Sequence, residues 1–333
     1  MSRRVTIKTI AEAVGVTHGT VSRALRDDPK VKRETALEVK RVAEELGYRP
    51  SRVARALKTR RTGTLAIVVS YVHDPFYSEV VHAVHDRLYP LDYNLVMAAT
   101  ETDLARQTSV AQKFLGQSVD GVFVCCLPGL TQPFKRLSEQ IPLVTINCDP
   151  SLHPAGVYHN DPEAVRQTVA YLVERGHRHI GYVGAENGGF AQTERRTAFF
   201  EEIRKLSLRS TELTCPDVKI EAAHAVADKW LGDSDIPRPT ALVCFNDTVA
   251  MGFMKACREH HLEVPEELSI VGFDDIEMAD FIHPGLTTFS QPRYEMGKVA
   301  TETMMGLLAG KGDGEQTKFL GKLVQRGTVG NIP

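Results

Sequence analysis

The sequence predicts an α/β protein that carries a small all-α unit at its N-terminus, and three observations lead to this prediction. Apolar residues near the N-terminus recur at helical spacing, whereas from Thr64 onward apolar runs alternate with helical segments. Positive charge is concentrated in the first 61 residues. The length of 333 residues also suits two or three domains better than one.

Two short helices are expected around a glycine turn. One helical face is predicted by an apolar set at positions i, i+3, i+4 and i+7, formed by Ile7, Ile10, Ala11 and Val14. Thr6 can cap this helix, Gly15 suits the turn, and Thr17 can cap a second helix that starts at His18. Such a pair is either an ordinary helical hairpin or a helix-turn-helix unit, whose second helix enters the DNA major groove.

Charge favours the helix-turn-helix interpretation. Residues 1–61 hold 16 Lys and Arg against 7 Asp and Glu, a net charge of +9, while the remainder holds 24 against 35, a net of −11. A basic head on an acidic body is typical of a module that binds phosphates. A third helix, with Val39, Val42 and Leu46 on one face, is expected to complete the small core before Gly47.

The segment from Ser51 to Gly63 permits two interpretations. It is either a charged linker or a short hinge helix whose apolar face contains Ala54 and Leu57. That face is too small to stabilise an isolated helix, but it could form in a dimer on DNA. Leu57 would then be a wedge in the minor groove, with Arg55 near phosphates.

The body is expected to contain parallel sheets with helices on both faces. Strands are predicted at 64–70, 94–100, 119–126, 142–147, 179–184, 241–245, 268–273 and 317–329. Helices are predicted at 76–89, 103–115, 133–140, 163–175, 194–205, 221–231 and 248–261. Helical crossovers between strands indicate a doubly wound arrangement, and its restart after Asn160 indicates two lobes with a ligand between them.

Polar residues follow several of these strands, where a doubly wound protein places ligand-binding groups. Asn246 and Asp274 end two strands, and Arg195 opens a helix after a glycine-rich loop. For Asp247 and Asp275 we favour a simpler role, a carboxylate at a helix N-terminus. Phe76 and Tyr77 could either form an aromatic wall or pack in the core.

The chain resembles the lac/gal repressor family of bacterial transcription regulators over nearly its whole length. The motifs that carry the resemblance occur in the family's order and include TIKTIAEAVGVTHGTVSRAL, EELGYRPSRVARALKTRRTGTLAIVV, GHRHIGYVG, TERRTAFFEEI, FNDTVAMGFMKA, VPEELSIVGFDD and HPGLTTFSQP. The resemblance implies a headpiece, a hinge helix and a core built like a periplasmic sugar-binding protein. It also implies a homodimer that binds pseudo-palindromic operator DNA under the control of a small molecule.

Two sets of site residues follow from the resemblance. The DNA-binding set is Thr6, Thr17, His18, Gly19, Thr20, Ser22, Arg23, Arg26, Ala54, Arg55 and Leu57. The effector-binding set is Phe76, Tyr77, Asn147, Arg195, Asn246, Asp274 and Gln291. Five positions depart from the family's usual residues: Thr9 replaces an acidic residue, Lys32 a capping Ser or Thr, Ser51 an Asn, Asn147 an Asp and Ala198 a Gly.

The resemblance also implies domain boundaries. The headpiece is expected at 1–49, the hinge helix and linker at 50–62, and the effector-binding and dimerisation core at 63–333. The N-lobe would comprise about 63–160 and 292–322, and the C-lobe about 161–291 and 323–333.

Other functional classes find less support. No nucleophile–base pair, phosphate loop or metal-ligand cluster is readable, so we expect no enzyme, cofactor or metal. The N-terminus lacks a signal peptide and no apolar run has membrane-spanning length, which argues against a transport protein and for the cytoplasm. The six cysteines include no C-x-x-C motif and are expected to be reduced thiols.

The sequence therefore predicts a DNA-binding transcriptional regulator, most readily a repressor, whose effector lies between two lobes. A sugar or glycoside is the first expectation for the effector, and a nucleobase or a sugar phosphate remains an alternative. Whether the effector releases or strengthens DNA binding stays open.

Overall fold

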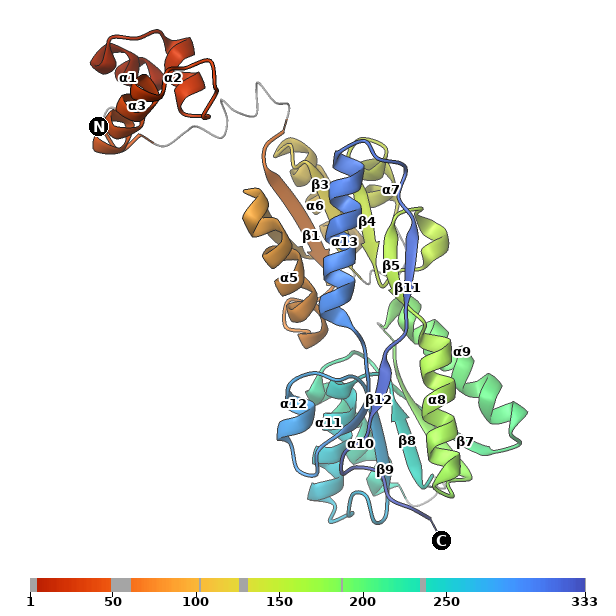
Figure 1. Ribbon diagram of the computed structural model, residues 1–333. Helices are drawn as coiled ribbons and strands as arrows, with labels where there is room; N and C mark the ends of the chain where they lie inside the picture. The colour runs from red at the N-terminus through yellow and green to blue at the C-terminus, as the bar shows by residue number, and fades with distance from the viewer. Residues whose placement is uncertain are drawn as a thin grey trace. The chain divides into compact units, whose positions relative to one another are not determined.

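A computed structural model describes residues 5–48, 61–101, 103–125, 131–186, 188–233 and 238–332 (Figure 1). The chain divides into two compact units, residues 1–62 and 63–333. Among the described residues, no helix has both the length and the apolar character needed to cross a membrane.

The N-terminal unit contains three helices, α1 (Ile7–Val14), α2 (His18–Ala24) and α3 (Arg33–Glu45). Thr6 and Thr9 form a reciprocal capping box at α1, and Thr17 accepts a hydrogen bond from the backbone of Thr20 at α2. Gly15 ends α1 with a φ of +72°, the left-handed conformation that glycine adopts without strain. The expected caps and turn are therefore present, and α3 starts at Lys32 without a side-chain cap.

The three helices bury one shared apolar cluster, which includes Ile10, Val21 and Val39 at full burial. These residues come from α1, α2 and α3 respectively, so each helix contributes its apolar face. The unit is small, and this cluster fixes the angle at which α2 presents its outer face.

The first sheet of the core is entirely parallel and has the order β11-β5-β4-β3-β1-β2. Its strands are β1 (Thr64–Val69), β2 (Asn94–Ala99), β3 (Gly121–Cys125), β4 (Leu143–Ile146), β5 (Gly156–His159) and β11 (Gln316–Phe319). Alternate residues of β1 point to opposite faces. Leu65 and Ile67 pack with α5 (Pro75–Leu88) and α13 (Arg293–Leu308), and Ala66 packs with α6 (Leu104–Gly116) and α7 (Gln132–Ser138).

The second sheet has the order β12-β10-β9-β8-β6-β7, and only its edge strand β12 runs antiparallel among the described strands. Its strands are β6 (His179–Ala185), β7 (Arg209–Cys215), β8 (Ala241–Cys244), β9 (Ser269–Asp274), β10 (Thr287–Ser290) and β12 (Lys322–Val324). One face packs against α8 (Asp161–Glu174) and α9 (Gly189–Lys205), the other against α10 (Ile220–Gly232) and α11 (Asp247–Glu259). Helix α12 (Met278–Phe281) and the 3-10 turns η1 (Tyr89–Leu91) and η2 (Pro150–Leu152) complete the described elements.

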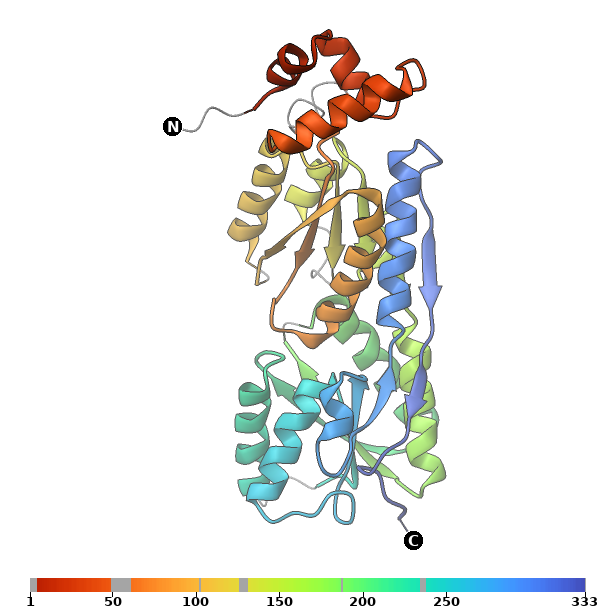
Figure 2. The ribbon, with the colours of Figure 1, turned by 60° about the vertical axis from the view of Figure 1, so that its left-hand side comes forward.

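The chain crosses between the two lobes at three places, as Figure 2 shows. Asn160 joins β5 to α8, Gln291 and Pro292 join β10 to α13, and Leu320 and Gly321 join β11 to β12. The observed fold therefore belongs to the class that the sequence predicts, with two doubly wound lobes that follow an all-α unit in the chain.

Two expectations about the C-terminal part were wrong. The single strand expected at 317–329 is two strands, β11 and β12, which belong to different sheets. Gly321 separates them, and a Cβ atom there would collide with the carbonyl oxygen of Ser290. Helix α13 had not been anticipated, although Met296, Ala300 and Met304 form an apolar stripe along its buried face, because Gly297 and Thr301 share that face and weaken the pattern.

Five cysteines lie in the described residues, and all five are buried and unpaired: Cys125, Cys148, Cys215, Cys244 and Cys257. Burial raises the pKa of the Cys215 and Cys257 thiols to about 12. The expectation of reduced thiols is confirmed for these five, and Cys126 lies outside the described residues.

Candidate functional site

A narrow pocket of about 50 Å³ lies between the two lobes of the core. This volume is below the roughly 300–1,000 Å³ that is usual for a small-molecule site. All seven positions of the expected effector-binding set line this pocket: Phe76, Tyr77, Asn147, Arg195, Asn246, Asp274 and Gln291. Further lining residues are Ser70, Tyr71, Asp74, Gly188, Ala191, Val218 and Phe245, none of which the sequence reasoning had assigned to the site. That these residues contact an effector stays a prediction.

Strand ends and helix starts place the polar side chains, as expected for parallel sheets. Asn147 follows β4 and Asp274 ends β9. Asn246 follows β8 and caps α11, where its side-chain oxygen accepts a hydrogen bond of 2.9 Å from the backbone of Val249. Asp74 caps α5 in the same way, accepting a hydrogen bond of 3.0 Å from Phe76.

The backbone is strained at the pocket. Asn147 has a φ of +55° and Asp274 a φ of +114°, and the following residue, Asp275, has a φ of +58°. Non-glycine residues rarely adopt such angles, and Asp274 lies well outside the usual left-handed well. Strain of this kind is held in place by surrounding contacts and is concentrated at functional sites.

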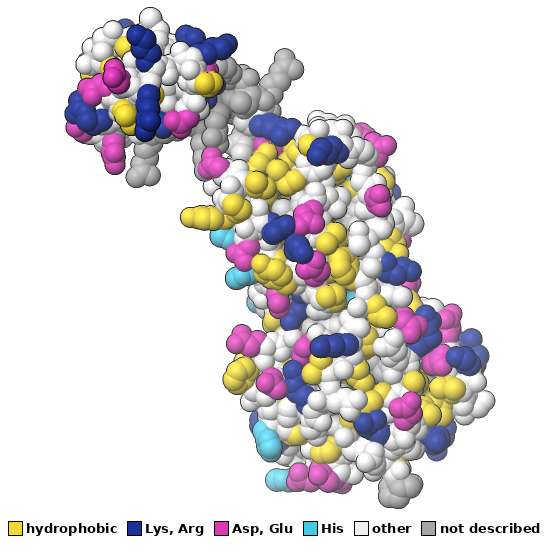
Figure 3. Space-filling model, viewed as in Figure 1, with side chains coloured by type: hydrophobic (Ala, Val, Ile, Leu, Met, Phe, Trp, Pro, Cys, Tyr) yellow, Lys and Arg dark blue, Asp and Glu magenta, His cyan; other side chains and the backbone are white. Residues whose placement is uncertain are grey.

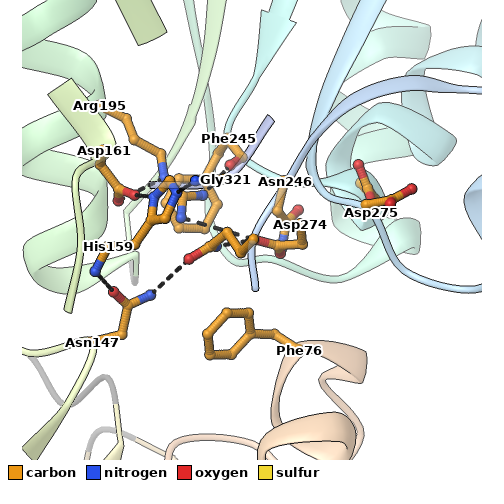
Figure 4. A network of polar contacts seen from close by, with 12 residues as sticks. Phe76, Asn147, His159, Asp161, Arg195, Phe245, Asn246, Asp274, Asp275 and Gly321 are labelled. Atoms are coloured by element: carbon orange, nitrogen blue, oxygen red, sulfur yellow. Dashed lines mark hydrogen bonds and ion pairs between the residues drawn. The ribbon is translucent and has the colours of Figure 1, made fainter. Parts of the chain in front are cut away.

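A short chain of hydrogen bonds joins the lobes across the pocket (Figure 4). The side-chain amide of Asn147 donates to Gln291 over 3.3 Å, and the amide of Gln291 donates to the Asp274 carboxylate over 2.6 Å. Asn147 belongs to the N-lobe, Asp274 to the C-lobe and Gln291 to a crossing segment. Each of these groups can also bond to a hydroxyl, so a ligand would compete directly with a contact between the lobes.

Arg195 is buried on α9, and its guanidinium is held on several sides. Its Nε donates to Asp161 over 2.9 Å, its Nη1 donates to the carbonyl oxygen of Phe245, and its Nη2 lies 3.9 Å from Asp274. The guanidinium carbon lies 3.7 Å from the centre of the Phe273 ring. Burial alone would lower the pKa of Arg195, but the charges of Asp161 and Asp274 offset this and raise it. The group is therefore a fixed cation with donors directed toward the pocket.

His159 lies behind this arginine and was missed by sequence reasoning. Its Nδ1 lies 2.6 Å from Asp161, and its Nε2 accepts a hydrogen bond of 3.0 Å from the backbone of Gly321. Because Nε2 accepts from Gly321, Nδ1 is the ring nitrogen that can donate to Asp161. The only sequence signal was the polar run from His159 to Asp161 at the first crossing.

Three carboxyl groups of the core, the half-buried Asp74 and the buried Asp247 and Asp274, have raised pKa values. Burial raises the pKa of Asp74 to about 6 and that of Asp274 to about 7. Burial also raises the pKa of Asp247 to about 8, with a further contribution from the charge of Asp274. A carboxyl group that titrates near neutrality in a cleft marks a candidate functional site.

Asp247 and Asp275 do not line the pocket, in agreement with a structural role. Asp247, in the first turn of α11, accepts hydrogen bonds from the backbone of Ile276 and from the hydroxyl of Thr288. Asp275 does not have the helix N-terminal role that we favoured, because it pairs with Arg326 over 2.8 Å. Figure 4 shows Asp275 directed away from the polar network.

Phe76 and Tyr77 combine the two roles that the sequence left open. Both side chains are buried and belong to the apolar cluster between α5, α13 and the first sheet. Both also line the pocket. In Figure 4 the ring of Phe76 lies below the polar network, where it can form an apolar wall.

The N-terminal unit exposes the residues expected to meet DNA. Thr6, Thr17, His18, Gly19, Arg23 and Arg26 are exposed, while Thr20 and Ser22 are half-buried. Basic side chains are prominent on the face of this unit that Figure 3 shows. The expected contacts Ala54, Arg55 and Leu57 lie outside the described residues.

Arg23 of α2 and Arg26, two residues after the end of this helix, both fold back onto α2. The Nε of Arg23 donates to the carbonyl oxygen of Gly19 over 3.1 Å, and that of Arg26 donates to the carbonyl oxygen of Ser22 over 2.9 Å. A Cβ atom at Gly19 would lie 3.4 Å from the Arg23 guanidinium. Gly19 thus leaves room for Arg23 to cover the start of the helix, although Gly19 itself offers no side chain.

No group of three or more His, Cys, Asp and Glu side chains among the described residues could hold a metal ion. The polar pocket and the exposed face of α2 are the two places where the residues of the expected sites lie. Together with the fold they define a regulator with a ligand-binding core.

Comparison with known proteins agrees with this class. Residues 6–51 match the family described as "Bacterial regulatory proteins, lacI family", and residues 169–329 match a "Periplasmic binding protein-like domain". The HTH-type transcriptional repressor PurR of Aliivibrio fischeri is 32% identical over 320 residues, covering 94% of each chain. The ribose operon repressor of Haemophilus influenzae is 30% identical over 318 residues, covering 95% of each chain. The chain belongs to the LacI family of bacterial transcription regulators, which confirms the resemblance.

Solved structures share the fold. The lac repressor dimer bound to operator and the anti-inducer ONPF has a TM-score of 0.89 at 22% identity, with 98% of this chain and 99% of that chain covered. The complex of the transcriptional regulator CelR with cellobiose has a TM-score of 0.73 at 24% identity, with 98% and 100% covered. The predicted fold class is confirmed by these similarities.

Proposed function

We propose that this protein is a sequence-specific transcriptional repressor whose affinity for its operator is switched by a sugar or glycoside bound between the two lobes. The observation that carries the proposal is the pocket itself, where carboxylate, amide and guanidinium groups converge beside aromatic rings. Relatives that are named as repressors support a regulator rather than an enzyme. Such a protein would act as a homodimer on pseudo-palindromic DNA in the cytoplasm.

The chemistry of the pocket suits a polyhydroxylated ligand. Each sugar hydroxyl both donates and accepts, so it needs acceptors such as Asp274 and donors such as Arg195 and Asn246. The apolar faces of a sugar ring can pack on Phe76 and Phe245. The solved complex of CelR with cellobiose and the ribose operon repressor supply precedents for this ligand class among related proteins.

The switch follows from the contacts between the lobes. A ligand hydroxyl that bonds to Asn147 or Asp274 replaces the bridge through Gln291, and this changes which angle between the lobes is most stable. The ligand shifts the population only by the difference between its affinities for the two arrangements. Gln291 and the hydrogen-bonded pair His159–Gly321 lie at segments where the chain crosses between the lobes. A small rotation of the backbone at these segments would displace a whole lobe.

On the DNA side we propose that α2 lies in the major groove. His18 and Arg23 would contact base edges, since arginine is the commonest bidentate reader of guanine. Thr17, Ser22 and Arg26 would contact phosphates and fix the register of the helix.

The proposal is tested by selecting operators from random duplexes and titrating the full chain on them at one salt concentration, with and without a panel of sugars. The expected result is a palindromic site whose affinity one sugar changes at least tenfold, about 1.4 kcal/mol. A purine nucleobase in the panel tests the alternative ligand class. Salt-dependent binding without a preferred sequence would contradict the proposal.

A further inference from the structure

We infer that the pocket takes an unphosphorylated ligand, neutral or cationic, which donates hydrogen bonds at once to Asp74 of the N-lobe and Asp274 of the C-lobe. The inference rests on the proposed function only in taking this pocket as the effector site. It narrows the ligand class, because a sugar phosphate was an open alternative.

Asp74 contributes a carboxylate to the N-lobe side of the pocket. One of its oxygens accepts the hydrogen bond from Phe76 that caps α5. The side chain of Asp74 is half-buried, so part of it remains accessible from the pocket. Asp74 lines the pocket, so a ligand can donate to this carboxylate.

Asp274 contributes the matching carboxylate on the C-lobe side. Its Oδ1 accepts from Gln291, and Arg195 lies 3.9 Å from the same oxygen. Asp274 is only 5% exposed and also lines the pocket. Asp74 and Asp274 line the same pocket from opposite lobes, and the charge of Asp74 contributes to the raised pKa of Asp274.

The balance of charge at the pocket is negative. Arg195 is the cation among the described lining residues, and Asp161 already compensates it at 2.9 Å. Asp74 and Asp274 then remain without a full counter-charge. Arg293 also reduces the repulsion between these two carboxylates. Its guanidinium is already bound, however, to Glu79 over 3.1 Å and to the carbonyl oxygen of Asp275 over 2.7 Å.

The start of α9 is the feature that favours an anion. Gly188 borders the pocket there, and α9 has no side-chain cap. A helix N-terminus acts as roughly half a positive charge, which does not offset the carboxylate of Asp74 together with the partly ionised carboxyl group of Asp274. A ligand phosphate would therefore be repelled by these carboxylates. Hydroxyl or amino hydrogens placed between Asp74 and Asp274 would instead reduce the repulsion between the two carboxylates and favour the approach of the two lobes.

The experiment uses matched probes on the full chain: glucose with glucose 6-phosphate, ribose with ribose 5-phosphate, and glucosamine. Thermal unfolding reports binding, and titration on the selected operator reports function. We expect an unphosphorylated member to raise the Tm and its phosphate to raise it less or not at all. The inference would be overturned if a sugar phosphate stabilised the chain more than its parent sugar. It would also be overturned if no neutral or cationic sugar of the panel stabilised the chain.

The two readouts separate the inference from the proposed function. A neutral sugar that raises the Tm without changing operator affinity would support the ligand class and contradict the regulator. A sugar phosphate that both stabilises the chain and changes operator affinity would support the regulator and contradict the ligand class.

Variants test the role of Asp74 directly. Asp74→Asn keeps the cap of α5 and removes the charge, so we expect at least tenfold weaker binding of the neutral sugar and a smaller difference between sugar and phosphate. Asp103→Asn is the matched control, because Asp103 caps α6 in the same way and does not line the pocket. Unchanged discrimination in Asp74→Asn would overturn the inference.

Discussion

The backbone N–H of Gly321 donates a hydrogen bond of 3.0 Å to the Nε2 of His159, although the two residues are 162 positions apart. His159 ends β5 at the first crossing between the lobes, and Gly321 lies at the third. The other ring nitrogen of His159 reaches Asp161, which in turn holds Arg195 at the pocket. A buried histidine therefore connects the ligand-facing arginine to two of the three segments about which the lobes can rotate.

Removing this histidine should cost both stability and response. His159→Ala leaves the Gly321 N–H and one Asp161 oxygen without their partner in a buried site, at a cost of about 2–4 kcal/mol. Urea unfolding measures the loss, and operator titration with the effector measures the response. His153→Ala is the control, because the ring of His153 bonds only to the backbone of Ala155 among the described residues. Equal losses in both variants would contradict the role assigned to His159.

Arg195 should be necessary for the effector and dispensable for DNA. Arg195→Lys keeps a charge near Asp161 but cannot reproduce the donors to Asp161 and Phe245 together. We expect at least tenfold weaker effector binding with unchanged operator affinity. Arg195→Ala is a poorer test, because it leaves Asp161 as an unpaired buried charge, at about 3–5 kcal/mol. Loss of operator binding in Arg195→Lys would make the residue structural.

Stability of the ligand-free protein should depend on pH through Asp274. Burial raises its pKa from 3.8 to about 7, so the folded state binds more protons than the unfolded state between these values. The contribution of Asp274 to stability therefore falls as pH rises from about 4 to about 7. The charged groups that act on it are Asp74, Asp247, Arg195 and Arg293.

Asp274→Asn removes this dependence while keeping an acceptor for Gln291. The variant should be more stable than the wild type at pH 8, by on the order of 3 kcal/mol, and the difference should shrink toward pH 4. Urea unfolding at several pH values measures it. If the difference in unfolding free energy between the variant and the wild type does not change with pH, the pKa of Asp274 is not raised in the folded state.

Substitutions on and directly after α2 should distinguish base contacts from phosphate contacts. His18→Ala and Arg23→Ala should each cost about 1–3 kcal/mol at one base pair and relax specificity there. Arg26→Ala should weaken all sequences alike and lower the dependence on salt. Binding measured on operators with single base changes at two salt concentrations distinguishes these outcomes. Uniform losses for all three variants would place α2 outside the groove.

The sequence predicted the parts of the fold that have strong apolar patterns. β1, β3 and β9 are fully or almost fully buried apolar runs, and they were recognised as strands. β7 was missed because it is an edge strand with a largely polar, exposed sequence. β5 and β10 were missed because their sequences, GVYH and TTFS, contain no apolar run like those of β4 and β8. β11 and β12 read as one strand, since only three-dimensional pairing shows that Gly321 separates two sheets.

The residues of the candidate site likewise include some that the sequence predicted and some that it did not. Asn147, Asn246 and Asp274 were found because they follow recognisable strands, and all three line the pocket. Asp74 was missed because an Asp before Pro at a helix start is accounted for by capping alone. His159 and Gly321 meet only because two crossings lie side by side, and one sequence carries no signal of such a contact.

The measurement that tests the central claim most directly is titration of the full chain on its selected operator at fixed salt, with and without the unphosphorylated sugar that most raises its Tm. We predict that the sugar changes operator affinity at least tenfold in the wild type and leaves it unchanged in Arg195→Lys. Equal operator affinity with and without a sugar that demonstrably occupies the pocket would contradict the claim that this pocket controls DNA binding.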